Sequence, residues 1–137
     1  GKGRRERLGI VFQFFNLLPA MTAVENVELP LLLAGRPARE ARARANELLD
    51  MVGLTARSTA FPHQMSGGEM QRAAVARALV HRPALVLADE PTGNLDSDNA
   101  DRILELLQKI ASRRLATLII VTHSPEAAAA AERRIPM

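Results

Sequence analysis

The chain has 137 residues, of which 47% are hydrophobic and 24% are charged, ordinary values for one globular unit. It contains no cysteine, which excludes a disulfide scaffold and a cysteine-ligated metal and fits the cytosol. No apolar run approaches the ~18 residues that cross a bilayer, and no signal-peptide pattern stands at the N-terminus.

The formal net charge is +3, and a basic chain can indicate nucleic-acid binding. The arginines are spread along the chain, however, and the one dense cluster is Arg4, Arg5 and Arg7. Aromatic residues make up only 3% of the chain, too few for a base-stacking platform. We interpret the charge as a solvated surface and expect no nucleic-acid partner.

The first predicted element is a strand over residues 8–12, and Gln13 follows at its carboxyl end. The loop after Gln13 is more apolar than a loop requires. We expect part of it to form an exposed apolar patch. Its apolar residues are Phe14, Phe15, Leu17, Leu18 and Met21.

Two helices are predicted next. The first starts at Thr22, because Thr22 and Glu25 have the spacing of a capping box. The second covers residues 37–52, with small and apolar residues along one face and arginines on the other. The apolar face comprises Ala41, Ala45, Leu48, Leu49 and Val52. We therefore expect residues 23–64 to form a helical insertion between two parts of a parallel sheet.

Ser66, Gly67 and Gly68 precede a helix predicted over residues 69–80, which are rich in strong helix formers. Serine is a preferred N-cap, and glycines let backbone N–H groups approach an anion without a Cβ in the way. The free amides and the positive end of the helix dipole make this N-terminus a candidate phosphate site. For these three residues alone, a capped surface helix is the simpler alternative.

A short apolar run over residues 84–88 predicts a buried strand of a parallel sheet. Asp89 and Glu90 follow at its carboxyl end, where ligands collect in open α/β sheets. Neighbouring strand positions point in different directions, so one carboxylate can hold a hydrated Mg²⁺ while the other polarises a water. A strand followed by an acidic N-cap explains these two residues equally well when they are taken alone.

Asp96 is the predicted N-cap of a helix over residues 99–113, in which apolar residues recur at helical spacing. The β-branched run over residues 115–122 predicts another strand, which ends at His123. A lone histidine after a strand is usually only a partly exposed side chain. A final alanine-rich helix is predicted over residues 126–134.

Two longer strings make these patterns specific. Residues 65–72, Met-Ser-Gly-Gly-Glu-Met-Gln-Arg, are similar to the Leu-Ser-Gly-Gly-Gln signature of ATP-binding cassette (ABC) ATPases, with glutamate in place of the glutamine. Residues 85–96 resemble the Walker B segment and D-loop of the same family, Gln13 its Q-loop glutamine and His123 its switch histidine. The resemblance implies a P-loop NTPase-like α/β nucleotide-binding domain with a parallel core sheet and an all-helical subdomain.

The resemblance also implies a dimer of two nucleotide-binding domains, with ATP and Mg²⁺ at their interface. Asp89 and Gln13 would hold the metal, Glu90 would act as general base, and His123 would contact the γ-phosphate. Asp96 would link the two sites. The residues that would contact ATP from the opposite protomer are Ser66, Gly67, Gly68 and Glu69.

The phosphate-binding loop Gly-x-x-x-x-Gly-Lys-Ser/Thr does not occur in the sequence. Lys2 follows a glycine, but Gly3 stands where a hydroxyl residue is required, and Lys2 lies far closer to Gln13 than in the family. The aromatic residue that stacks on adenine and the first strands are also missing. We therefore expect a nucleotide-binding domain truncated at both ends, which does not hydrolyse ATP by itself.

Residues 11–35 and 87–96 resemble the bacterial lipoprotein-releasing, macrolide-export and cell-division ABC ATPases. This implies a subunit at the cytoplasmic face of the inner (plasma) membrane, attached through a transmembrane permease and powering export or lipoprotein release. One alternative is an inactive folded remnant. The other is a DNA-repair or chromosome-maintenance ATPase, which the short stretch between Gln13 and Ser66, without sustained heptads, disfavours.

Overall fold

The computed structural model describes residues 8–12 and 15–130. Three strands and five α-helices follow one another along these residues, with two 3₁₀ turns between the second and third of these helices. The elements are β1 (Leu8–Val11), α2 (Ala23–Leu33), α3 (Ala38–Met51), η1 (Thr55–Arg57), η2 (Pro62–Gln64), α4 (Gly67–Leu79), β2 (Leu85–Asp89), α5 (Ser97–Ser112), β3 (Thr117–Val121) and α6 (Pro125–Ala130).

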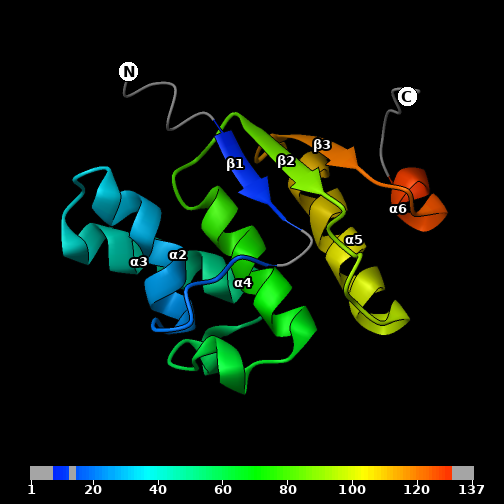
Figure 1. Ribbon diagram of the computed structural model, residues 1–137. Helices are drawn as coiled ribbons and strands as arrows, with labels where there is room; N and C mark the ends of the chain where they lie inside the picture. Colours follow the sequence, from blue (N-terminus) through cyan, green and yellow to red (C-terminus); the bar gives the residue numbers. More distant parts are fainter. Residues whose placement is uncertain (1–7, 13–14, 131–137) are drawn as a thin grey trace.

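The strands form one parallel sheet in the order β1-β2-β3 (Figure 1). Val11 lies opposite Ala88 in the first pair, and Asp89 lies opposite Val121 in the second. Because the strands are parallel, their carboxyl ends meet at one edge of the sheet. The predicted parallel α/β arrangement is therefore confirmed, and the residues after β1, β2 and β3 are brought together at that edge.

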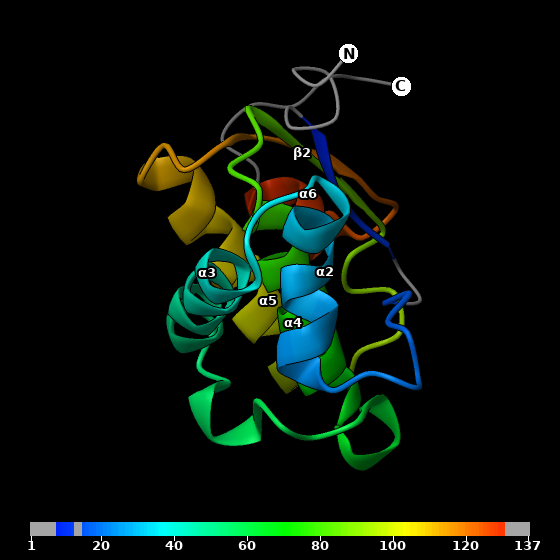
Figure 2. The ribbon, with the colours of Figure 1, turned by 90° about the vertical axis from the view of Figure 1, so that its left-hand side faces the viewer.

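Helices α4 and α5 cover one face of the sheet, as the two views in Figures 1 and 2 show. α4 packs on β1 and α5 packs on β3. Val86 and Ala88 of β2 are fully buried, whereas Leu85 and Leu87, which alternate with them, are only half-buried. The predicted buried strand is thus fully buried on one face only, because among the described residues the helices lie on one side of β2.

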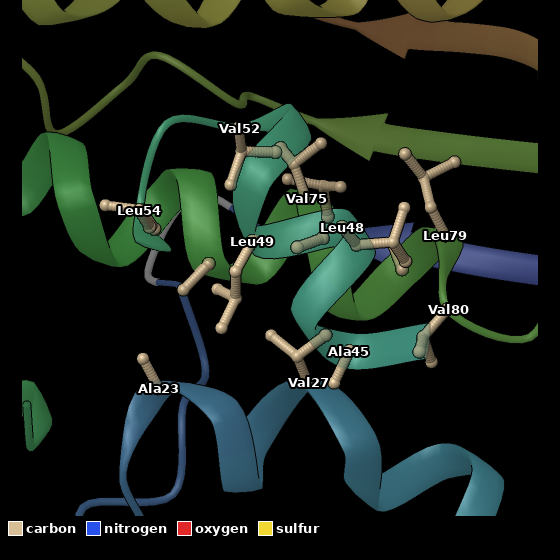
Figure 3. Close-up of a cluster of buried hydrophobic side chains, with 14 of the residues drawn as sticks. Ala23, Val27, Ala45, Leu48, Leu49, Val52, Leu54, Val75, Leu79 and Val80 are labelled. Atoms are coloured by element: carbon tan, nitrogen blue, oxygen red, sulfur yellow. The ribbon is translucent and has the colours of Figure 1, made fainter. Parts of the chain in front are cut away.

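A second layer of helices packs on α4 away from the sheet. Helices α2, α3 and α4 contact one another pairwise. Figure 3 shows side chains from all three helices gathered in a shared core, with Val27 from α2, Leu49 from α3 and Val75 from α4. The predicted apolar face of α3 is confirmed, since its leucines and small residues are the buried ones.

The loop before α2 is tied to that helix. The predicted capping box is present: Thr22 Oγ1 accepts a hydrogen bond from the Glu25 N–H at 3.3 Å, and Glu25 Oε1 accepts one from the Thr22 N–H at 2.9 Å. The buried Asn26 accepts from the Leu18 N–H at 2.8 Å and donates to the Leu18 carbonyl at 3.2 Å. Leu18 is held in place with 43% of its surface exposed, while Leu17 packs partly against the core.

Several element boundaries differ from the predictions. α4 begins at Gly67, so both glycines lie inside the first turn and not before it. β3 is shorter than predicted, and α6 is described only to Ala130, so the rest of the predicted final helix lies outside the described residues. None of the helices that the structure describes is both long enough and apolar enough to cross a membrane.

Candidate functional site at the carboxyl edge of the sheet

The end of β2 places two carboxylates at the carboxyl edge of the sheet. Asp89 is the last residue of the strand, and it is exposed. Glu90 has a left-handed φ of 47°, and its N–H donates to the Val121 carbonyl at 2.7 Å. Because Glu90 has left the extended conformation, the alternation of strand side chains does not set the directions of the two carboxylates. A turn does so instead.

The carboxylate of Glu90 is held from the end of β3. Glu90 Oε2 accepts a hydrogen bond from Thr122 Oγ1 at 3.2 Å, and Oε1 accepts one from the His123 N–H at 2.5 Å. Both oxygens therefore have a donor, and hydrogen bonds to an ionised acceptor are stronger than neutral ones. The structure thus brings Glu90 and His123 together, with the carboxylate fixed in one orientation and the His123 residue exposed.

Asp89 suits a Mg²⁺ that is shared with phosphate oxygens. Among the described residues, no group of three or more His, Cys, Asp and Glu side chains lies close enough to form a metal cage. Mg²⁺ in phosphate sites is bound by one or two carboxylates together with waters and phosphate oxygens, so it needs no such cage. An exposed carboxylate at a strand end meets that requirement. Gln13, the other predicted ligand, lies outside the described residues.

The start of α4 is a complete capping box. Ser66 Oγ accepts a hydrogen bond from the Glu69 N–H at 3.1 Å, and Glu69 Oε1 accepts one from the Ser66 N–H at 2.9 Å. Glu69 Oε2 also accepts from Arg57 Nε at 3.1 Å. The backbone hydrogen bond from Ser66 and the charge of Arg57 hold the pKa of Glu69 below its ordinary value, against the opposing effect of burial.

The glycines at this helix start permit close packing against α5. A Cβ on Gly68 would lie 2.1 Å from Asn99 Oδ1, whereas a Cβ on Gly67 would lie at an ordinary 3.5 Å from Leu95 Cδ2. The N–H of Asn99 donates to Asp96 Oδ1 at 2.8 Å, which confirms Asp96 as the N-cap of α5. Asn99 therefore connects Gly68, a predicted ATP contact, to Asp96, the residue predicted to link the two sites.

Two residues at this edge have roles that the sequence analysis did not assign. The sequence pattern places Thr122 at the end of a strand and gives it no function. It marks Gln71 only as a helix-forming residue, yet Gln71 is 0% exposed and donates a hydrogen bond to the Phe12 carbonyl at the end of β1. The one sequence feature that could have indicated a role for Gln71 is its position as a long polar residue on the apolar face of α4.

A cavity of about 600 Å³ lies elsewhere, lined by the end of α2, by α3 and by the segment between α4 and β2. Its lining includes Arg36, Arg44, Arg82 and Ala84. Ala84 precedes the first residue of β2, so this cavity opens at the amino edge of the sheet, opposite Asp89. It is separate from the predicted site residues.

Comparison with known proteins shows the family to which the chain is related. Residues 2–93 match the family model described as ABC transporter. The chain is 52% identical over 134 residues to the lipoprotein-releasing system ATP-binding protein LolD of Bordetella pertussis, covering 98% of this chain and 58% of that protein. For LolD of Treponema pallidum the identity is 55% over 131 residues, covering 96% and 58%. An uncharacterized ABC transporter ATP-binding protein of Mycobacterium tuberculosis is 52% identical over 130 residues, covering 95% and 52%.

The fold agrees with solved ATP-binding cassettes. A dimeric post-hydrolysis structure of the cassette MJ0796, bound to ADP and Pi, superposes with a TM-score of 0.82 at 44% identity, covering 96% of this chain and 58% of that one. The chain therefore belongs to the ABC transporter family, and its fold is that of an ABC nucleotide-binding domain. Among the relatives compared it is similar to the LolD proteins, and it spans slightly more than half of their length.

Proposed function

We propose that these residues belong to the ATP-hydrolysing subunit of an ABC transporter that drives export or lipoprotein release. The observation that carries the proposal is the fixed carboxylate of Glu90, which stands beside Asp89 at the carboxyl edge of the sheet. Its hydrogen bonds to Thr122 and His123 orient it without neutralising it. A general base needs this combination of charge and fixed direction.

In this proposal each polar residue at the carboxyl edge of the sheet has a distinct role in ATP hydrolysis. Asp89 holds Mg²⁺, which supplies charge stabilisation to the phosphates when bound. Glu90 accepts the proton of the attacking water, and His123 stabilises the charge that develops on the γ-phosphate. Gln13 positions the metal and the water.

The start of α4 would serve the second protomer's ATP. Ser66 Oγ accepts a hydrogen bond from the helix, so its hydroxyl proton remains available for donation to a phosphate oxygen. The N-terminal amides of α4 add further donors, and Asp96 would link the two sites through Asn99. The solved cassettes MJ0796 are described as dimeric, which supports a dimer here.

We also assign residues 23–64 to a helical subdomain that contacts a transmembrane permease at the cytoplasmic face of the membrane. Leu18, in the loop just before this subdomain, supports this contact. Asn26 of α2 holds its backbone by a hydrogen bond, while 43% of the Leu18 surface stays exposed. In the complete protein, meaning the full product of the gene that encodes these residues, Leu18→Ser should reduce co-purification with the permease. Leu115→Ser, which changes a leucine of similar exposure at 44%, is the matched control. Equal recovery of the permease with both variants would reject the contact.

The test of hydrolysis is Glu90→Gln in the complete protein. It should still bind ATP but lose about 10²–10⁴-fold in turnover, the usual contribution of a positioned base. Glu105→Gln, an exposed carboxylate on α5, should keep wild-type turnover and is the matched control. Near-normal hydrolysis by Glu90→Gln would reject the role of Glu90. A wild-type protein that does not hydrolyse ATP at all would reject the proposed function and favour an inactive relative.

A further inference from the structure

Gln71 is a buried polar residue of α4 that none of the roles above explains. Its side chain is fully buried, although its neighbours on that face of the helix are alanine and valine. Burying an amide is unfavourable unless its hydrogen bonds are made. The Nε2 atom makes two, to the Phe12 carbonyl at 3.0 Å and to the Pro91 carbonyl at 2.6 Å.

The chemistry of the two partners fixes the orientation of this amide. Both are carbonyl oxygens, which only accept, so the NH₂ group of Gln71 must face them. Each of its two N–H groups then has one carbonyl. Among the described residues the other amide atom, Oε1, is buried without a partner. A methionine would fill similar space without a polar atom, so packing alone does not favour glutamine at this position.

The two carbonyls belong to the neighbours of two predicted site residues. The Phe12 carbonyl is part of the peptide unit that joins Phe12 to Gln13, and Pro91 directly follows Glu90. These hydrogen bonds span 59 and 20 positions of the sequence. One nitrogen atom of α4 therefore joins the end of β1 to the turn after β2.

A second side chain of α4 holds the chain on the other side of residues 13–14. Arg77 donates from Nη2 to the Phe15 carbonyl at 3.0 Å and from Nη1 to the Asn16 carbonyl at 2.7 Å. Phe15 and Asn16 have left-handed φ angles of 63° and 61°, which is unfavourable for phenylalanine, whereas asparagine adopts this region more readily. Burial lowers the pKa of Arg77, but an arginine stays charged in proteins, so its donors are retained.

We propose that Gln71 is a positioning residue for ATP hydrolysis, which fixes the turn after Glu90 relative to the end of β1 through the carbonyls of Pro91 and Phe12. This inference rests on the proposed function. Because Gln71 lies in the same helix that begins at Gly67, a movement of the start of α4 would be transmitted to the Pro91 carbonyl, and so to the turn that holds Glu90. A misplacement of about 1 Å at a reacting centre can cost roughly 10²-fold in rate.

The first test is Gln71→Met in the complete protein. The variant keeps the length of the side chain and removes both donors. We expect kcat to fall about 10- to 100-fold, while KM for ATP changes much less, because the lost interaction acts on the reacting geometry and not on nucleotide binding. A kcat equal to that of the wild type would overturn the proposal.

The matched control is Arg44→Met. Arg44 also donates to two backbone carbonyls, those of Val80 at 3.2 Å and Leu79 at 3.3 Å, but at the opposite end of α4. It should lower Tm as Gln71→Met does, yet leave kcat unchanged. If the two variants lose kcat equally at equal loss of Tm, Gln71 is a stability residue and the proposal is wrong.

Gln71→Glu gives an independent result if Gln71→Met does not fold. Its carboxylate would face two carbonyls and repel them, whereas the protonated acid can donate one hydrogen bond. Burial raises the pKa of such a carboxyl, so kcat relative to the wild type should rise as the pH is lowered from about 8 to about 6. A ratio that does not change with pH in the folded variant would contradict the proposal, and so would failure of both variants to fold.

The same assays distinguish failure of the proposed ATPase function from failure of the positioning role of Gln71. No hydrolysis by the wild type would reject the proposed function. Hydrolysis that Glu90→Gln abolishes and Gln71→Met leaves intact would reject only the positioning role of Gln71.

Discussion

The start of α4 and the end of β2 hold their polar side chains in opposite ways. At α4, Ser66 and Glu69 bond to each other across three positions of the sequence. At β2, the carboxylate of Glu90 is held by Thr122 and His123, 32 and 33 positions away. Local bonds depend only on the helix that contains them. Long-range bonds exist only when the sheet has formed, so the geometry around Glu90 is the more dependent on the rest of the fold.

The largest expected effect concerns nucleotide binding by the 137-residue chain itself. The end of β2 offers carboxylates, which repel a polyphosphate, and the sequence lacks the Gly-x-x-x-x-Gly-Lys-Ser/Thr loop that cradles it. We expect isothermal titration with Mg-ATP to show no binding and ATPase assays to show no turnover. Micromolar binding would show that another segment of the chain supplies a phosphate site and would contradict this prediction.

The second prediction tests the long-range bonds at the end of β2. In the complete protein, Thr122→Val removes the hydroxyl that donates to Glu90 Oε2 and accepts from the Ser124 N–H at 2.9 Å. We expect kcat to fall about tenfold, which corresponds to the loss of one hydrogen bond to a charged group. Thr117→Val, an exposed threonine at the other end of β3, should keep wild-type turnover. Full activity of Thr122→Val would mean that the His123 N–H suffices to orient Glu90.

The third prediction tests packing at the start of α4. In Gly68→Ala the new Cβ would meet Asn99 Oδ1 at 2.1 Å, so Asn99 must move, and overpacking of this kind costs about 1–3 kcal/mol. In Gly67→Ala the nearest atom is at 3.5 Å, and alanine gains about 1 kcal/mol of helix propensity over glycine. In thermal unfolding, Gly67→Ala should therefore have a higher Tm than Gly68→Ala. Equal Tm values would show that Asn99 relaxes without cost.

The smallest expected effect concerns Glu69 and pH. Its pKa is lowered in the folded state by the hydrogen bond from Ser66 and by Arg57. The resulting stabilisation is therefore complete above the ordinary glutamate pKa of about 4.3 and is lost as the pH falls through the lower folded value. Glu69→Gln keeps the capping acceptor and removes this titration. Its Tm should differ from that of the wild type near neutral pH and approach it in acid. A difference independent of pH would contradict the assignment.

The same contrast between local and long-range bonds decides how much the sequence could predict. The capping box at Thr22 and the N-caps at Ser66 and Asp96 follow from neighbouring residues, and all three were predicted; the return bond from the Ser66 N–H to Glu69 was not. Parallel pairing followed from apolar runs separated by helices. The hydrogen bond from Thr122 to Glu90 could not be predicted, because it depends on the left-handed turn at Glu90 and on the register of β3. The roles of Gln71 and Arg77 depend on backbone carbonyls, which have no signature in sequence.

The close approach of β1 to α4 has a consequence for libraries of variants. A Cβ on Gly9 would lie 2.2 Å from the Ala78 carbonyl oxygen, a backbone atom that no rotamer change can move away. Gly9 should therefore tolerate no substitution in a saturation screen, although it contacts no residue proposed for catalysis. A screen scored on transport alone would group it with Asp89 and Glu90. Scoring abundance alongside transport would separate them, because variants at Gly9 should disappear from the cell while those at Glu90 accumulate.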